Sequence, residues 1–236
     1  MSVWAIVPFK GAENAKRRLS PQLSADVRSR LALAMLNDVL QALVDAKSVD
    51  GILLTSRSVE ARRIAEKWDI TLYRDQAHTL VDALTAASEK VKNDLNATTA
   101  IIVPGDVPLI TGTDVDHVLH YHAAVTIVPD SHKIGTNALV CTPPNAFPLV
   151  FDGRSYQPHI EAANHLGLQV RSVQSDAFAI DVDTADDLLL VNSSRKHSLT
   201  QTLLNSEPEL ASLIKELKLA HHAPSVSVGA MPDNAD

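Results

Sequence analysis

The chain contains a single cysteine, Cys141, among its 236 residues, which excludes an intramolecular disulfide and a cysteine-based zinc cluster. Aromatic residues make up only 4% of the sequence, so aliphatic side chains have to form most of the core. No segment approaches the roughly 18 apolar residues needed to span a bilayer. The N-terminus also lacks the charged region and cleavage site of a secretory signal. We therefore expect a cytoplasmic protein that does not enter the membrane.

Positive charge is scarce as well, since the formal net charge is -7 and the pI is about 5.8. A protein of this balance has no overall field that attracts nucleic acid. Basic residues do gather locally, in the segment from Lys10 to Arg18. A short basic segment in an acidic protein suits a small anion better than a polymer, so the expected partners are small-molecule substrates.

Apolar runs of strand length alternate with segments of helical periodicity. Expected strands cover 3–7, 51–55, 70–73, 99–103, 124–128, 137–141 and 169–173. Between and after them we expect helices over about 24–46, 58–68, 79–91, from 113, over 155–166 and from 184. This alternation predicts an α/β domain over residues 1–193, with a largely parallel sheet covered on both faces. Residues 194–236 are expected to form an extension with one helix, Pro208–Leu219, and a disordered tail, Ala223–Asp236.

Two acidic turns, each after an apolar run, are the most informative motifs. The first holds Asp106 in Pro104–Pro108, and the second holds Asp181 and Asp183 just before Thr184. Carboxylates at the carboxyl ends of buried strands lie at the rim where open α/β sheets bind ligands. Two such turns brought together would offer an oxygen-rich site suited to Mg²⁺ with a phosphate substrate. Each turn taken alone is also typical of a simple turn or helix cap.

The basic segment after the first strand contains Lys10, Lys16, Arg17 and Arg18. It is neither a Walker loop nor a dinucleotide fingerprint, because the required glycines are missing. Lysine and arginine in this place are nevertheless suited to reach over a triphosphate. The alternative is a solvated basic loop.

Two further segments offer small residues, hydroxyls and backbone donors, namely 135–139 and 151–155. Ser155 opens an expected helix, and a helix N-terminus binds phosphate or carboxylate well. A simple N-cap and turn is the competing interpretation.

Taken in order, these motifs resemble the CofC/FbiD guanylyltransferases of coenzyme F-420 biosynthesis. The resemblance covers about residues 1–193 and rests on five segments: Val7–Lys10 with Ala15–Leu19, Gly105–Leu109, Gly135–Leu139, Phe151–Ser155 with His159, and Asp181–Thr184. It implies a three-layer α/β/α nucleotidyltransferase fold with a mostly parallel mixed sheet, similar to that of the molybdopterin guanylyltransferases. It also implies a homodimer.

The resemblance further implies transfer of GMP from GTP to 2-phospho-L-lactate, phosphoenolpyruvate or 3-phospho-D-glycerate, with release of pyrophosphate. Asp106 and Asp183 would hold Mg²⁺ and, with Lys16, form the catalytic set. The nucleotide would be bound by Lys10, Lys16, Arg18, Asp106, Thr79, Leu80 and Asp82, the last three near the guanine. The acceptor would be bound by Thr136 or Asn137, Gly153 and Ser155.

The sequence departs from the family pattern in two places. Ala185 follows Thr184 where the family often has proline, a change that a helix tolerates. The segment after Ser193 also extends beyond the usual family length. Two other functions stay open at this point: a related nucleotidyltransferase with another nucleoside triphosphate or acceptor, and a non-catalytic GTP sensor.

Overall fold

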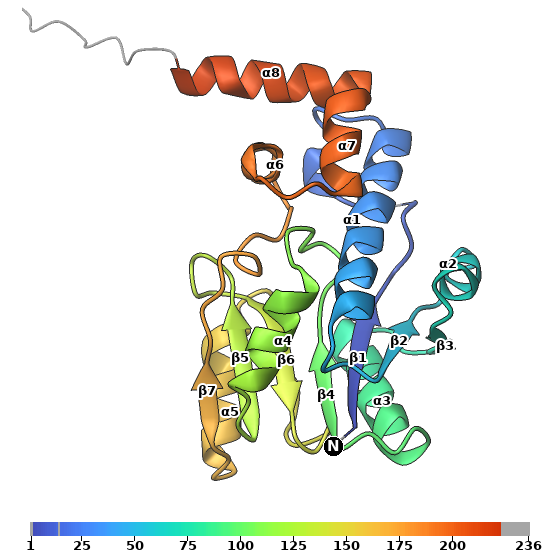
Figure 1. Cartoon of the computed structure of the whole chain (residues 1–236), viewed down its shortest axis with the longest axis vertical. Coiled ribbons are helices and arrows are strands. Elements are labelled where there is room, and N and C mark those ends of the chain that lie inside the picture. Colours follow the sequence, from blue (N-terminus) through green and yellow to red (C-terminus); the bar gives the residue numbers. More distant parts are fainter. Residues whose placement is uncertain (1, 14, 223–236) are drawn as a thin grey trace, which may run out of the picture.

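The computed structural model describes residues 2–13 and 15–222, which form one mixed sheet with helices on both faces (Figure 1). The strands are β1 Val3–Pro8, β2 Gly51–Thr55, β3 Thr71–Tyr73, β4 Thr99–Ile102, β5 Val125–Pro129, β6 Thr136–Cys141 and β7 Val170–Ser172. The helices are the short 3-10 helix η1 Arg17–Leu19, then α1 Ala25–Asp45, α2 Ala61–Trp68, α3 Leu80–Asn93, α4 Gly112–His120, α5 Tyr156–His165, α6 Ala185–Ser193, α7 Leu199–Ser206 and α8 Pro208–His222. The predicted tail, Ala223–Asp236, lies outside the described residues.

The strand order across the sheet is β3-β2-β1-β4-β6-β5-β7. Neighbouring strands pair in parallel except β6, which runs antiparallel between β4 and β5. The mostly parallel mixed sheet is therefore confirmed. Because β6 is reversed, its first residue, Thr136, lies beside Pro129 at the edge where β4 and β5 end.

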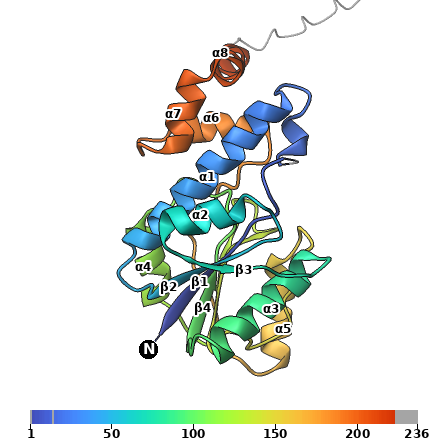
Figure 2. The same cartoon turned by 90° about the vertical axis from the view of Figure 1, so that its right-hand side faces the viewer.

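Two helical layers sandwich the sheet, as Figure 2 shows for α1 and α2 on one side and α3 and α5 on the other. Along β1, Ala5 and Val7 pack under α1, α2 and α4, whereas Ile6 packs toward α3 and α5. All three residues are fully buried. Burial on both faces explains why the sequence shows continuous apolar runs instead of alternation.

The C-terminal helices form a further apolar cluster with the amino-terminal half of α1. Leu31 and Met35 of α1 meet Leu188 of α6, Leu204 of α7 and Leu213 of α8 there. In Figure 1 these helices lie at the top, away from the N-terminus at the foot of β1. The boundary proposed after Ser193 stays a prediction.

Helix α7 was not expected from the sequence. Its start is held by the buried Asp38 of α1, whose carboxylate oxygens each accept one backbone N–H, from Leu199 and Thr200, at 2.8 Å. A carboxylate at a helix N-terminus satisfies unpaired amides and the helix dipole. Ser198 caps the helix locally by accepting the Gln201 N–H at 3.1 Å, a Ser-x-x-Gln pattern that the sequence does contain. Asp38 comes from a helix about 160 residues earlier, which no local pattern reveals.

At the opposite end of the sheet, His122 is half-buried between two threonine hydroxyls. Its Nδ1 lies 3.0 Å from Thr126 Oγ1 and its Nε2 lies 2.9 Å from Thr142 Oγ1. Burial lowers the pKa of His122 to about 4, from an ordinary value of 6.5.

Because the pKa of His122 is lowered in the folded protein, we expect the protein to lose stability in acid. Unfolding raises the pKa of His122, so between pH 6.5 and 4 the unfolded chain binds the extra proton and the free energy of unfolding falls as pH falls. Replacing His122 with glutamine is expected to make the free energy of unfolding fall less steeply with pH in this range, which urea unfolding at several pH values measures. An identical pH slope in the two proteins would contradict the assignment.

Candidate functional site

The two acidic turns meet at the rim of the sheet. Asp106 lies in the turn after β4, and the backbone N–H of Val182 donates to the Asp106 carbonyl at 3.0 Å. The ammonium of Lys16 then bridges both side chains, 2.6 Å from Asp106 Oδ2 and 3.2 Å from Asp183 Oδ1. A single cationic group therefore reaches both predicted carboxylates.

One expectation about the second turn is wrong. No strand precedes Asp183, because β7 ends at Ser172 and Val173–Asp183 is loop. The apolar run Phe178–Ile180 forms no strand, and it contributes instead a fully buried anchor, Phe178, to the core. This anchor and the backbone contact with the first turn bring Asp183 to the rim.

Lys16 lies in the left-handed region, with φ 50° and ψ 47°, as the residue before η1. This conformation costs a non-glycine residue on the order of 1 kcal/mol, and it directs the side chain inward, where only 9% of it is exposed. Burial alone would lower the pKa of Lys16, but the charges and hydrogen bonds of Asp106 and Asp183 outweigh it and raise the pKa. The exposed Arg18 adds a contact of 2.7 Å from its Nη1 to Asp183 Oδ2.

Asp181 is a third carboxylate at this rim. Asn137 Nδ2 donates to Asp181 Oδ1 at 3.2 Å and to the Phe178 carbonyl at 2.8 Å. Burial raises the pKa of Asp181, and the charge of Asp106 adds to the rise against the hydrogen bond from Asn137. In strand geometry Asp181 and Asp183 would face the same way, so the sequence indicated that both could reach one ion, which stays a prediction.

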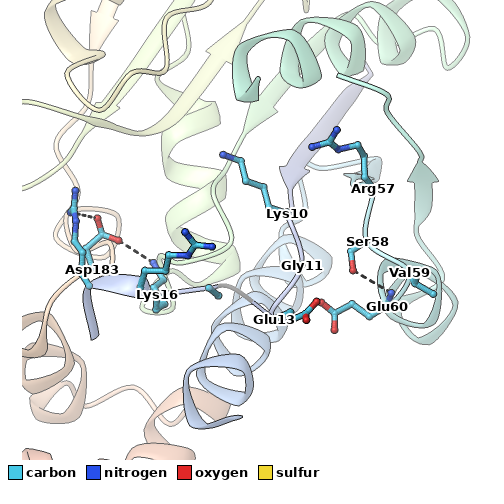
Figure 3. Close-up of a pocket in the computed structure, with 12 residues that line it drawn as sticks. Lys10, Gly11, Glu13, Lys16, Arg57, Ser58, Val59, Glu60 and Asp183 are labelled. Carbon is cyan, nitrogen blue, oxygen red and sulfur yellow. Dashed lines mark hydrogen bonds and ion pairs between the residues drawn. The ribbon is translucent and has the colours of Figure 1, made fainter. Parts of the chain in front are cut away.

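Beside the carboxylates opens a cleft of about 1130 Å³. Figure 3 shows Lys16 and Asp183 on one side of it and Lys10 and Arg57 on the other. Its lining carries five basic residues, Lys10, Lys16, Arg17, Arg18 and Arg57, against three acidic ones, Glu13, Glu60 and Asp183. Glu60 is engaged locally, since it accepts the backbone N–H of Ala12 at 2.5 Å. The sequence analysis missed Arg57, although it follows β2 at the same rim.

A smaller cavity of about 100 Å³ adjoins the cleft and shares Lys10 and Arg57 with it. Thr79 and Leu80, which the resemblance places near the guanine, line this cavity together with the buried Asp75; their contact with a base stays a prediction. Asp82 does not line it: the exposed Asp82 carboxylate accepts a hydrogen bond from the Thr79 hydroxyl at 2.8 Å, which closes the first turn of α3.

On the other side of the carboxylates, a hairpin joins β5 to β6 at the rim. The carboxylate of Asp130 closes it by accepting backbone N–H groups from His132, Ile134 and Gly135 at 2.8–3.0 Å. The register between β5 and β6 shifts next to Asn137. Such a bulge re-aims side chains. Asn137 therefore reaches the second acidic turn, while Thr136 contacts His159 of α5.

Ser155 and Gly153 lie farther along, at the start of α5. Ser155 is buried and precedes the helix without capping it through its side chain. Gly153 is exposed, with φ +89°, a conformation that favours glycine. A bond of 3.0 Å from the Tyr156 N–H to the Ile134 carbonyl fastens this segment to the hairpin. Within residues 2–13 and 15–222, no hydrogen bond joins Gly153 or Ser155 to Asp106 or Asp183.

Lys196, in the segment after α6, braces the first acidic turn. Its ammonium donates to the carbonyls of Pro108, at 2.8 Å, and Ile110. Burial lowers the pKa of Lys196, against the charges of Asp38, Asp114 and Asp45. The C-terminal segment thus supports the turn that carries Asp106.

Replacing Lys196 with methionine is expected to lower the free energy of unfolding by about 1–3 kcal/mol, because two turn carbonyls lose their donor. We also expect kcat to fall less than tenfold, because the turn that carries Asp106 loosens. Urea unfolding and turnover measure the two effects. Lys215→Met on the exposed face of α8 is the matched control. Equal stability of the two variants would show that the hydrogen bonds of Lys196 to the turn do not stabilise the protein.

The sequence of the chain matches a known protein family. The family model described as "Guanylyl transferase CofC like" matches residues 3–206, most of the chain. The chain belongs to this family. The CofC-like chain is 35% identical over 192 residues to a phosphoenolpyruvate guanylyltransferase of Conexibacter woesei, covering 80% of this chain and 86% of the relative. It is 34% identical to a 2-phospho-L-lactate guanylyltransferase of Methanothermobacter thermautotrophicus, covering 80% and 83%.

Solved structures agree on the fold of this CofC-like protein. A Desulfovibrio desulfuricans structure, provisionally described as a nucleotide-diphospho-sugar transferase, superposes with a TM-score of 0.75 at 22% identity, covering 92% of this chain and 98% of that one. A nucleotidyl transferase from Methanothermobacter thermautotrophicus gives 0.63 at 14% identity, covering 87% and 99%. The predicted nucleotidyltransferase fold is confirmed, and the family makes the protein a nucleotidyltransferase enzyme. Over the described part of the chain, no helix is long and apolar enough to cross a membrane.

Proposed function

We propose that this enzyme transfers the guanylyl group of GTP to the phosphate of a small phosphorylated carboxylic acid and releases pyrophosphate. Candidate acceptors are phosphoenolpyruvate, 2-phospho-L-lactate and 3-phospho-D-glycerate. The observation that carries the proposal is the meeting of Asp106, Asp183 and Lys16 beside a basic cleft. The names of the two relatives, which act on phosphoenolpyruvate and on 2-phospho-L-lactate, support it.

The carboxylate pair fits Mg²⁺. Within residues 2–13 and 15–222, no three His, Cys, Asp or Glu side chains are arranged as a metal cage. Mg²⁺ is commonly held by only one or two carboxylates, with water and substrate phosphates completing its shell. Asp106 and Asp183 would hold the ion, since both already reach the one ammonium of Lys16. Bound there, Mg²⁺ would neutralise negative charge on the reacting phosphates.

The basic residues of the cleft would neutralise and bind the triphosphate of GTP. Lys10, Arg18 and Arg57 would bind the phosphates, and the cavity beside Thr79 and Leu80 would take the guanine. Arginine suits this role because its planar fork pairs with phosphate oxygens, whereas lysine acts as a point charge. Asp82 would act on the nucleotide only through the start of α3.

The acceptor would enter from the hairpin side. Thr136, Asn137 and the loop from Gly153 to Ser155 would orient its phosphate and carboxylate, with one phosphate oxygen in line with the α-phosphorus of GTP. That oxygen forms the new P–O bond while the bond to pyrophosphate breaks. A phosphate is already deprotonated enough to attack at neutral pH, so positioning and charge compensation carry the rate.

The test is a pyrophosphate-release assay with GTP, Mg²⁺ and each of the three acids, with the mass of the product determined. We expect release with at least one acid and a product that joins GMP to the acid. Faster release with CTP, UTP or ATP would favour a related nucleotidyltransferase. GTP binding without release in the presence of all three acids would favour a sensor.

Three other expectations are proposals too: a role in coenzyme F-420 biosynthesis and a homodimer, which the resemblance implies, and a cytoplasmic location, which the sequence indicated. Sedimentation of the purified chain tests the homodimer. A monomer at working concentration would overturn it.

A further inference from the structure

His159 of α5 is fully buried next to the proposed acceptor site, and both of its ring nitrogens are engaged. Val150 N–H donates to Nε2 at 3.0 Å, and Nδ1 lies 3.1 Å from Thr136 Oγ1. The rings of Phe147 and Phe151 pack edge-on against the imidazole, with centroids 5.7 and 4.8 Å away. The ring therefore has little freedom to turn.

These contacts fix the tautomer of His159. A backbone N–H can only donate, so Nε2 must be the accepting nitrogen. A neutral imidazole has one accepting and one donating nitrogen, which leaves the proton on Nδ1. Burial keeps the ring neutral, because it lowers the pKa of His159 to about 4 against the charge of Asp152. Nδ1–H therefore donates to Thr136.

The tautomer in turn fixes what the Thr136 hydroxyl can do. A hydroxyl has one proton, and its oxygen already accepts from His159. Among the described residues, the Thr136 side chain has no other hydrogen-bond partner. Its proton is thus left to be donated away from α5. Thr136 stands at the start of the reversed strand β6, at the rim that carries Asp106.

We propose that His159 is a positioning residue that makes the Thr136 hydroxyl a donor directed at an anionic oxygen of the acceptor, its carboxylate or its phosphate. The inference rests on the proposed function. It predicts that His159 affects binding of the acid and not of GTP, because, among the described residues, Thr136 is the one proposed acceptor-binding residue that the His159 side chain hydrogen-bonds.

Two conservative variants separate this role from simple packing. The amide nitrogen of asparagine occupies the place of Nδ1, so His159→Asn keeps the donor to Thr136 and loses the acceptor for Val150. Glutamine places its oxygen near Nε2, so His159→Gln keeps the acceptor for Val150 and loses the donor to Thr136. We expect His159→Gln to raise KM for phosphoenolpyruvate at least about tenfold, the scale of one hydrogen bond to a charged group. KM for GTP should stay unchanged, and His159→Asn should remain within about threefold of wild type in both.

Thr136→Val provides a second measurement that does not disturb the imidazole. It should raise KM for phosphoenolpyruvate as much as His159→Gln, and the double variant should be no worse than either one. His122→Gln is the matched control, because His122 also bridges polar groups through both nitrogens but lies at the other end of the sheet. It should lower stability and leave both KM values unchanged.

Several results would overturn the inference. These are an unchanged KM for phosphoenolpyruvate in both His159→Gln and Thr136→Val, equal impairment of His159→Asn and His159→Gln, or a parallel rise in KM for GTP. ¹⁵N NMR of the wild-type histidines adds a direct check, since a protonated Nε2 in His159 would refute the argument at its first step. If the wild-type enzyme releases no pyrophosphate with any of the three acids, the proposed function itself fails. The wild-type assay is done before the variants are compared, so this failure is distinguished from a failure of the inference about His159.

Discussion

Replacing Asp106 with asparagine is expected to lower kcat by at least about two orders of magnitude, the scale seen when a preorganised electrostatic contact is removed. Asparagine keeps the shape of the side chain but removes the charge that would hold Mg²⁺. Asp183→Asn should have an effect of similar size, because both carboxylates reach the same cation position. Pyrophosphate release at saturating GTP and acceptor measures the effect.

The control for these variants is Asp94→Asn, which removes an exposed carboxylate paired with Lys90 at the end of α3. Its kcat should equal that of wild type. If Asp106→Asn and Asp183→Asn both turn over at near-normal rates, the two residues do not hold the metal. Because the substituted side chains are 31% and 39% exposed, we expect the variants to fold.

Replacing Lys16 with methionine is expected to have two effects of different kinds. It should lower kcat by about two orders of magnitude, through the loss of a charge beside the reacting phosphates. It should also lower the free energy of unfolding of the metal-free protein by about 1–3 kcal/mol, because Asp106 and Asp183 lose a shared hydrogen-bonded cation.

The second effect offers a sharp test of the geometry. Added Mg²⁺ should stabilise Lys16→Met more than wild type, since the ion replaces the missing charge between the two carboxylates. Thermal unfolding with and without Mg²⁺ measures the difference. Lys67→Met, on α2 and away from the cleft, is the control. An equal Mg²⁺ response in wild type and Lys16→Met would mean that the lysine and the ion do not share a position.

The sequence predicted the sheet correctly, and with it the positions of Lys10 and Asp106 at one rim, for a physical reason. Buried parallel strands appear in a sequence as continuous apolar runs. The polar residues that follow such strands lie at one rim of the sheet, where the carboxyl ends of the strands meet. Lys10 after β1 and Asp106 after β4 obey this rule, and Arg57 after β2 obeys it too, although it was overlooked.

The remaining features depend on contacts that no local pattern records. Asp183 reaches the rim on a loop, anchored by Phe178, where a strand was expected. Helix α7 is short, and the first two of its N–H groups donate to the distant Asp38. The tautomer of His159 depends on a backbone amide nine residues away, and its partner Thr136 lies beside a bulge. Such features follow from tertiary packing, which sequence periodicity does not encode.

The reversal of β6 has a consequence for how such an enzyme can change its preference among acids. The residues proposed for the nucleotide follow strands β1, β2, β3 and β4, whereas Thr136 and Asn137, proposed for the acceptor, come at the beginning of a strand, directly after the hairpin closed by Asp130. Substitutions or insertions in that hairpin could therefore change the surroundings of the acceptor without moving the backbone that would bind the nucleotide. With the proposed sites, the architecture would separate the two specificities physically, so each could change during evolution while Asp106 and Asp183 stay in place.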